Sequence, residues 1–217
     1  MKISPNTLAV LKSFTSINPS ILINVGNVLR TISPQKTIMA IAEVDDSFES
    51  EFAIYDLNQF LSAVSLFENP DFTFSDRHVT IATGKSSIKY FFADKNMVLA
   101  APAKAISLPD VVVEFRLSIE TLKATMQAAS VFQAPNWSVA GRSGEIVLEV
   151  GDVKNATSNK YQVIVGETDQ TFDLVFKAEN LKVMPSNYNV NISSKGISHF
   201  TNETGSLQYF IATESPR

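Results

Sequence analysis

Residues 87–93 read Ser-Ile-Lys-Tyr-Phe-Phe-Ala, and residues 206–212 read Ser-Leu-Gln-Tyr-Phe-Ile-Ala. A second echo joins residues 3–8 with residues 117–122. The two offsets, 206 − 87 = 119 and 117 − 3 = 114, differ by only a few residues. A long internal period indicates two similar packed units built on one plan. The sequence therefore predicts a duplicated domain.

Further matches lie between these two echoes in the same order. Pro19 corresponds to Pro135, and Gly26 corresponds to Gly144. Residues 100–109 contain two prolines and no periodicity, which is typical of an extended connector. A chain of 217 residues is long enough for two cores. We therefore expect a first domain at residues 1–99, a connector at 100–113 and a second domain at 114–217.

The composition excludes several classes of protein. The chain is 45% hydrophobic and 18% charged, as in ordinary globular proteins. It has no cysteine, so disulfides and thiol catalysis are excluded. Residues 1–6 place a proline and polar groups where a signal peptide needs apolar residues, and no window approaches the ~20 apolar residues that cross a bilayer. The net charge of −4 argues against a general nucleic-acid binder but allows a local basic face.

Helix signals open both halves. Ser4 can cap a helix that starts at Pro5 and continues at apolar spacing to Asn18-Pro19. Asp56 can cap a second helix, Ser118 a third that runs to about Phe132, and a short fourth is expected at residues 179–184. Strand-like runs are expected at residues 21–25, 28–32, 37–44, 52–55, 71–75, 79–83 and 87–93, with a similar series in the second half. The predicted fold class is α+β, with two sheet-rich domains that each carry two helices on one face.

The polar faces of these helices contain almost no acidic residue. They carry amides, hydroxyls and lysines instead: Asn6, Lys12, Ser13, Asn58, Gln59, Ser62, Ser65, Lys123, Gln127, Ser130, Asn180 and Lys182. One interpretation is an ordinary solvated helix surface. The alternative is a surface that faces a polyanion, where lysines meet phosphates and amides do not repel them.

Several runs resemble a known family. They are Met1–Ser4, Ala9, Leu11-Lys12, Phe14, Ile17-Asn18, Ala53–Asn58, Phe60-Leu61, Ser65-Leu66, Asn180–Lys182, Pro185 and Asn187-Tyr188. The sequence resembles the sliding clamps of T-even-type bacteriophages over essentially its whole length, most closely in the first half. The resemblance implies a homotrimeric ring of six pseudo-equivalent domains, with helices around a central hole for duplex DNA and sheets as the outer wall.

The resemblance also implies a function without catalysis, cofactor or metal. Such a clamp tethers the replicative DNA polymerase after an ATP-driven clamp loader has placed it on DNA, here in the cytoplasm of an infected bacterial host. The best-matching DNA-facing residues are Lys12 and Lys182, followed by Lys123 and Lys177. The helix that opens the second half departs from the family, because Gln127 and Ser130 stand where relatives carry more basic residues.

Two further surfaces follow from the resemblance. Subunits are expected to join through edge strands, for which the candidates are residues 95–100, with Met97 and Leu99, and residues 160–166, with Tyr161, Val163 and Val165. A partner peptide is expected between the connector and the last strand, at Ile106, Leu108, Ile211 and Ala212. The alternative for these four side chains is that they only pack the connector against the domain.

Enzymatic interpretations find little support in the residues. His78 and His199 have no carboxylate or serine at a recognisable motif spacing, and residues 141–144 are better explained as a hairpin turn than as a phosphate-binding loop. A sugar- or peptide-processing enzyme lacks the paired functional carboxylates it needs. The main alternative function is a viral structural trimer with duplicated β-rich domains.

Overall fold

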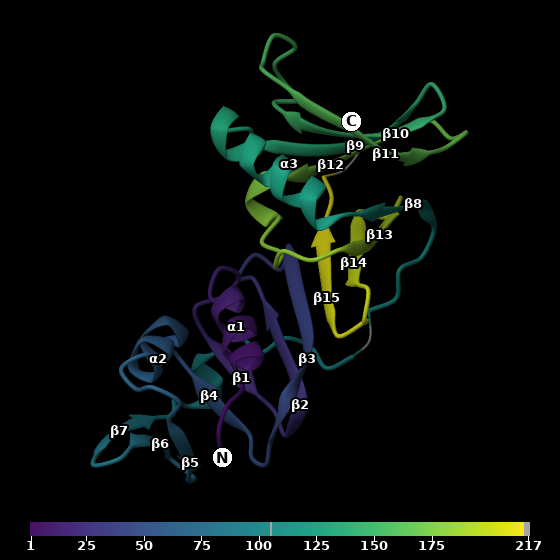
Figure 1. Cartoon of the computed structure of the whole chain (residues 1–217). Helices are drawn as coiled ribbons and strands as arrows, with labels where there is room; N and C mark the ends of the chain where they lie inside the picture. Colours follow the sequence, from purple (N-terminus) through teal and green to yellow (C-terminus); the bar gives the residue numbers. More distant parts are fainter. Residues whose placement is uncertain (105, 215–217) are drawn as a thin grey trace. The chain divides into compact units, whose positions relative to one another are not determined.

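The computed structural model describes residues 1–104 and 106–214 and contains two compact units, Met1–Lys104 and Ala105–Arg217 (Figure 1). The boundary falls inside the expected connector. Ala105 of that connector and residues 215–217 of the expected second domain lie outside the described residues. Below, unit 1 and unit 2 refer to these two parts.

Unit 1 contains two helices, α1 and α2, and three sets of paired antiparallel strands. Its sheets are β1 with β4, β2 with β3, and β5-β6-β7 in that order. The elements are α1 (Pro5–Phe14), β1 (Ile21–Ile23), β2 (Gly26–Ile32), β3 (Ile38–Phe48), β4 (Phe52–Ile54), α2 (Leu57–Val64), β5 (Asp71–Phe74), β6 (His78–Thr83), β7 (Ser86–Phe91) and the 3-10 turn η1 (Lys95–Met97).

Unit 2 contains one long helix, α3, and two antiparallel sets of strands ordered β11-β10-β9-β12 and β15-β14-β13-β8. The elements are β8 (Val111–Leu117), α3 (Ile119–Phe132), β9 (Asn136–Arg142), β10 (Glu145–Gly151), β11 (Tyr161–Glu167), β12 (Phe172–Lys177), the 3-10 turn η2 (Ala178–Asn180), β13 (Tyr188–Ser193), β14 (Ile197–Asn202) and β15 (Leu207–Ala212).

Matching hydrogen bonds support the duplication. The side chains of Ser4 and Ser118 each accept a 3.1 Å bond from the backbone N–H three residues later, which caps α1 and α3 alike. The backbone N–H of Leu57 donates to the carbonyl of Pro19 at 2.7 Å, and Ala178 donates to the carbonyl of Pro135 at 2.9 Å. The corresponding prolines therefore hold corresponding segments in both units.

Each unit builds its core mainly from apolar residues of its strands and helices. In unit 1, Leu11 and Phe14 of α1 are completely buried, and in unit 2 Leu122 of α3 is completely buried. Burying such side chains stabilises a fold by roughly 1.5–3 kcal/mol each. The helices therefore turn their apolar stripes inward and leave their polar faces to solvent.

The fourth helix predicted at residues 179–184 is not a helix. The chain makes only the turn η2 and then an extended segment in which Leu181 and Val183 are buried and Lys182 is exposed. Alternating burial requires an extended backbone, because side chains at i and i+2 share a face only in a strand-like conformation. Pro185 then follows too closely for a longer helix to form.

Two strand boundaries also differ from the expectation. β3 continues through the acidic residues to Phe48, because Val44 and Phe48 remain buried while Asp45 faces solvent. Residues 95–100 do not form a strand. Asp94 accepts a 2.8 Å bond from the backbone N–H of Asn96, which starts the turn η1 in place of a strand ladder. Among the described residues, no helix is long and apolar enough to span a membrane.

Candidate nucleic-acid interface

The exposed face of α1 carries one lysine and no acidic residue. Asn6, Ala9 and Lys12 are exposed along this face, opposite the buried Thr7, Leu11 and Phe14. Lys12 lies in the last turn, where the negative end of the helix dipole favours a cation. The exposed face of α2 is neutral, with Asn58, Gln59 and Ser62.

Helix α3 presents a comparable face in unit 2. Lys123, Gln127 and Ser130 are exposed at helical spacing, and Glu120 in the first turn is the acidic residue of this face. In the part of the chain that the structure describes, neither Lys12 nor Lys123 forms an ion pair with a carboxylate. Both ammonium groups are therefore available to an anion from outside.

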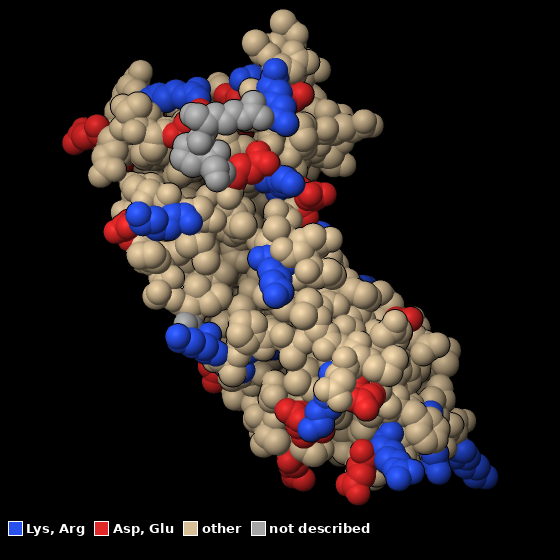
Figure 2. Space-filling view, turned by 180° about the vertical axis from the view of Figure 1, so that it is seen from behind, with Lys and Arg blue, Asp and Glu red and all other residues tan. Residues whose placement is uncertain are grey.

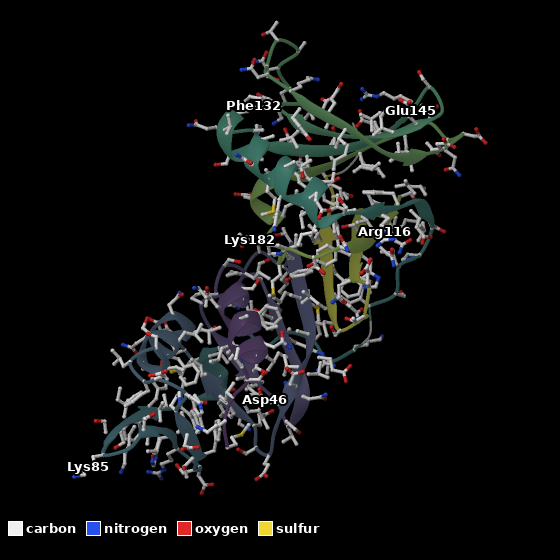
Figure 3. The ribbon with its side chains drawn as sticks, in the orientation of Figure 1. Asp46, Lys85, Arg116, Phe132, Glu145 and Lys182 are labelled. Carbon is white, nitrogen blue, oxygen red and sulfur yellow. The ribbon has the colours of Figure 1, made fainter. Side chains whose placement is uncertain are left out.

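Lys177 and Lys182 are also exposed, but neither lies on a helix. Lys177 ends β12 and lines a hollow of about 490 Å³ together with Asp152, Glu179 and Glu214. Lys182 lies on the extended segment after η2 (Figure 3). Asp152, Glu179 and Glu214 reduce the positive potential around Lys177, and Lys154 in the same hollow partly offsets them.

On the face shown in Figure 2, lysines and arginines are interspersed with aspartates and glutamates and form no continuous patch. Of the six ion pairs among residues 1–104 and 106–214, five join side chains that are both about a third exposed or more, for example Lys2–Asp71 and Lys195–Asp110. Such surface pairs contribute little to stability. Any attraction for a polyanion therefore depends on basic side chains outside these pairs, such as Lys12 and Lys123.

A half-buried acidic side chain holds the start of α1. Asp46 on β3 accepts a 2.8 Å bond from the backbone N–H of Ser4 and a 2.6 Å bond from the hydroxyl of Thr7. Burial alone opposes ionisation of this carboxyl, but the hydrogen bonds from Thr7 and Ser4 outweigh it and lower the pKa of Asp46. Sequence analysis treated Asp46 as part of a loop and missed this role.

A neutral side chain makes the corresponding contact in unit 2. Asn187 accepts a 2.8 Å bond from the backbone N–H of Ile119, which immediately follows the capping residue Ser118. Both helices that carry an exposed lysine are thus fixed at their first turn by a side chain far away in the sequence. This fixes the direction in which each exposed face points.

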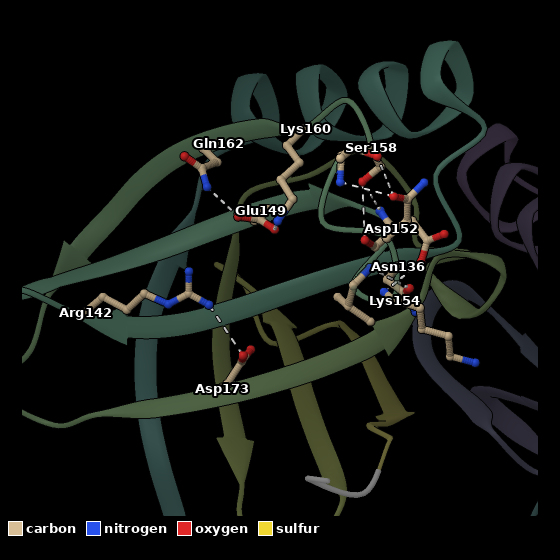
Figure 4. A network of polar contacts seen from close by, with 12 residues as sticks. Asn136, Arg142, Glu149, Asp152, Lys154, Ser158, Lys160, Gln162 and Asp173 are labelled. Carbon is tan, nitrogen blue, oxygen red and sulfur yellow. Dashed lines mark hydrogen bonds and ion pairs between the residues drawn. The ribbon is translucent and has the colours of Figure 1, made fainter.

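A second carboxylate lies almost buried on the sheet of unit 2. Glu149 on β10 accepts a 2.8 Å bond from the ammonium of Lys160 and another bond from Gln162 (Figure 4). Burial raises the pKa of Glu149, but the bonds from Lys160 and Gln162 and the nearby charge of Arg142 reverse this and lower it. The network fixes the start of β11, the strand that carries Tyr161, Val163 and Val165.

The residues expected at subunit contacts lie in two kinds of structure. Tyr161, Val163 and Val165 lie on β11, which is an edge strand of its sheet. Met97 and Leu99 lie in and just after η1 and are exposed, but they belong to no strand. In unit 1, β7 is one of the two edge strands of the sheet β5-β6-β7. Sequence analysis located β7 but did not identify it as an edge.

The four expected partner-peptide residues do not form one exposed site. Ile106 and Leu108 lie in the extended connector and are half-buried, and Ala212 at the end of β15 is half-buried too. Ile211 is fully buried in the core of unit 2, because the inward face of β15 carries it. Its side chain is therefore not available to a partner.

The two halves of the chain match two sequence families. Residues 3–106 match the family described as DNA polymerase processivity factor, and residues 114–215 match the family described as gp45 sliding clamp, C terminal. A sliding clamp of Vibrio phage KVP40 is 34% identical over 223 residues. The alignment covers 99% of this chain and 100% of the relative. A sliding clamp of Escherichia phage RB69 is 31% identical, with coverage of 99% of this chain and 97% of the relative.

Solved structures of clamps have the same fold at low identity. The Helicobacter pylori beta clamp superposes with a TM-score of 0.71 at 12% identity, over 99% of this chain and 65% of that chain. PCNA of A. fulgidus, solved with the C-terminal region of FEN-1, has a TM-score of 0.69 at 12% identity, over 97% of this chain and 95% of that chain.

These findings confirm the α+β clamp fold and the resemblance stated from the sequence, and they favour a clamp over a viral structural protein. The chain therefore belongs to the bacteriophage sliding clamp family of DNA polymerase processivity factors.

Proposed function

We propose that this protein forms a homotrimeric ring around duplex DNA and tethers the replicative DNA polymerase to it. We further propose that a clamp loader ATPase places the ring, in the cytoplasm of an infected bacterial cell. The protein itself is proposed to act without catalysis or cofactor. The observation that carries the proposal is the pair of fixed helices, α1 and α3, whose exposed faces hold unpaired lysines and only one acidic residue.

The proposed DNA contacts are few and directed to phosphates. Lys12 and Lys123 are the primary candidates, and Lys182 and Lys177 are additional ones. In a trimer each lysine occurs three times around the hole. Phosphate contacts carry no sequence information, and their number sets the salt dependence of binding. A sparse set of lysines therefore suits a protein that stays on DNA by enclosing it and slides along it.

Charge reversal tests this proposal. We expect the variant Lys12→Glu with Lys123→Glu to reduce clamp loading and polymerase processivity at least several-fold, because six lysines of the ring then repel phosphate. The matched control is Lys36→Glu, since Lys36 is equally exposed but lies in the turn between β2 and β3. Equal processivity of the reversed variant and the control would contradict the assignment of α1 and α3 to the DNA side.

Polymerase binding is proposed at the connector. Ile106, Leu108 and Ala212 remain the candidates, and the FEN-1 segment on A. fulgidus PCNA provides a precedent for peptide binding by a protein of this fold. We expect Leu108→Asp to weaken binding of the polymerase by tenfold or more, since loss of a buried apolar anchor costs about 2 kcal/mol. Its oligomeric state should not change. Unchanged polymerase affinity would move the site elsewhere.

A further inference from the structure

We infer that a hollow in unit 2 is a further protein-binding site, which takes an extended segment of a partner with a basic side chain. The hollow lies where β9 begins and where β10 and β12 end, and its volume is about 490 Å³. Its polar lining consists of the carboxylates of Asp152, Glu179 and Glu214, the ammonium groups of Lys154 and Lys177, and the amide of Asn136. The residues proposed for polymerase binding at the connector do not line it. The inference therefore goes beyond the proposed function and does not depend on the ring.

A hydrogen-bond donor on a buried side chain is unused in this hollow. Asn136 is 6% exposed, and its side-chain oxygen accepts a long bond of 3.4 Å from the backbone N–H of Val153 (Figure 4). Because an N–H donates only to the oxygen of an amide, this bond fixes which way the group points. Within residues 1–104 and 106–214, the amide nitrogen of Asn136 has no partner. Buried polar groups in native proteins are nearly always paired, so this donor is available to a group that fills the hollow.

A buried asparagine also lies beside the corresponding proline of unit 1, but its amide is fully engaged. Asn18 precedes Pro19, and its nitrogen donates to the carbonyl of Ile32 at 2.9 Å. Its oxygen accepts a 2.9 Å bond from the backbone N–H of Ser20. Unit 1 therefore uses the whole amide within its fold, whereas unit 2 leaves the nitrogen of Asn136 facing the hollow.

Carboxylates outnumber ammonium groups around this donor. None of the five charged side chains of the lining forms an ion pair in the described chain. Asp152 and Glu214 are half-buried, whereas Lys154 and Lys177 are exposed on long flexible stems that reach into solvent. The fixed part of the wall is thus acidic. A cation that enters the hollow is attracted by the carboxylates and reduces their mutual repulsion.

These groups define the chemistry of the occupant. A free amide donor matches a backbone carbonyl, and carboxylates match the ammonium of a lysine or the guanidinium of an arginine. A peptide segment offers both groups within one residue, whereas the carboxylates repel the phosphates of a nucleic acid. The occupant is therefore a protein segment with a basic side chain.

Exposed apolar side chains flank the lining residues in the chain. Phe132, at the end of α3, is 40% exposed and lies two residues before Ala134 (Figure 3). Val153, between Asp152 and Lys154, is 44% exposed. A small-molecule site is mostly apolar inside and encloses its ligand, whereas here the interior is charged and the apolar groups lie outside it. This arrangement fits a segment in which an apolar residue adjoins the basic one.

Peptide titration followed by NMR tests the inference on the full chain. The probe is acetyl-Ala-Leu-Arg-Ala-amide, and the matched control carries citrulline, which has the shape of arginine without its charge. We expect the arginine peptide to shift the side-chain amide signals of Asn136 in a saturable way, because the free nitrogen then finds an acceptor. The citrulline peptide should bind about fivefold more weakly, since it loses the charge-assisted bonds.

Charge neutralisation locates the binding. Glu179→Gln with Glu214→Gln removes two carboxylates whose side chains have no hydrogen bond or ion pair in the described part of the chain, so the fold should be retained. We expect this variant to bind the arginine peptide about fivefold more weakly and the citrulline peptide equally well. Glu49→Gln with Glu68→Gln, two exposed residues of unit 1, changes the net charge by the same amount and is the control. It should keep the affinity for the arginine peptide within about twofold.

Three results would overturn the inference and leave the proposed ring intact. Unshifted Asn136 signals would mean that the hollow holds only water. Equal binding of the two peptides would show that the carboxylates do not recognise the basic group. An equal loss in the control variant would show that a general attraction to an acidic protein, rather than the hollow, holds the peptide. The ring is tested separately, by the oligomeric state of the unmodified protein in sedimentation velocity.

Discussion

Units 1 and 2 are built on one plan but differ in their buried polar contacts. Each unit buries a polar side chain on a strand, Thr31 on β2 of unit 1 and Glu149 on β10 of unit 2. Thr31 is 2% exposed and its hydroxyl has no partner among the described residues, whereas Glu149 is 7% exposed and bonds to Lys160 and Gln162. A buried polar side chain is thus unsatisfied in unit 1 and part of a hydrogen-bond network in unit 2.

The side chains that hold the first turns of α1 and α3 also differ, in their charge. α1 is held by the charged Asp46 and α3 by the neutral Asn187. Apolar core residues and capping serines recur in both units, whereas the polar contacts differ between the units. The comparison indicates that hydrophobic packing and helix caps determine the shared fold, and that polar contacts give each unit its own response to pH and mutation.

The largest expected effect concerns the network of unit 2. We predict that Lys160→Met lowers the free energy of unfolding by about 2 kcal/mol, because Glu149 is left nearly buried without its cationic partner. The value lies below that of a fully buried pair because Lys160 is 35% exposed. Urea unfolding at neutral pH measures it. Lys154→Met, an exposed lysine nearby in sequence, is the control, and an equal effect of both would contradict this role of Lys160.

The next effect concerns the acidic anchor of unit 1. We predict that Asp46→Asn lowers the free energy of unfolding by about 1 kcal/mol at pH 7, because two hydrogen bonds to a partly exposed charge are weakened. The folded-state pKa of Asp46 is lowered, so its stabilisation is complete above the ordinary value of 3.8 and is lost as the pH falls below it.

The difference between Asp46→Asn and the unmodified protein should therefore shrink below about pH 4. Thermal unfolding at a series of pH values measures it, with Asp76→Asn, in the exposed turn between β5 and β6, as control. A destabilisation that stays constant down to pH 2 would show that the charge of Asp46 is not what holds α1.

The smallest expected effect is a gain in stability. We predict that Thr31→Val stabilises the protein by about 0.5–1 kcal/mol, because an isosteric methyl group replaces a buried hydroxyl without a partner. Differential scanning calorimetry should show a higher Tm, whereas Thr83→Val at the exposed end of β6 should leave it nearly unchanged. A lower Tm for Thr31→Val would mean that this hydroxyl is satisfied.

Much of the fold was predictable from local signals. Ser4, Asp56 and Ser118 cap the helices that their positions predict, and strands such as β6 and β7 follow their apolar alternation. The failed prediction at residues 179–184 has a tertiary cause. Leu181 and Val183 are both needed in the core, and this requirement overrides the helical pattern.

The candidate surfaces were predictable only in part. Lys12 and Lys123 were found because a helical wheel shows which side of an amphipathic helix faces solvent. Residues 160–166 were predicted as an edge strand, and β11 lies at a sheet edge; β7 was located but not recognised as an edge, because only the strand order shows this. Asp46 was missed for a similar reason, because its partners Ser4 and Thr7 are about forty residues away in the sequence.

The central claim is that a ring encloses DNA and is held by topology. Retention on DNA tests it most directly: the clamp is loaded on nicked circular DNA, isolated by gel filtration, and measured before and after a restriction enzyme linearises the circle. We predict retention on the circle and loss from the linear form, because weak phosphate contacts allow the ring to slide off an end. Equal retention on both forms would mean that ordinary affinity holds the protein, and would contradict encirclement.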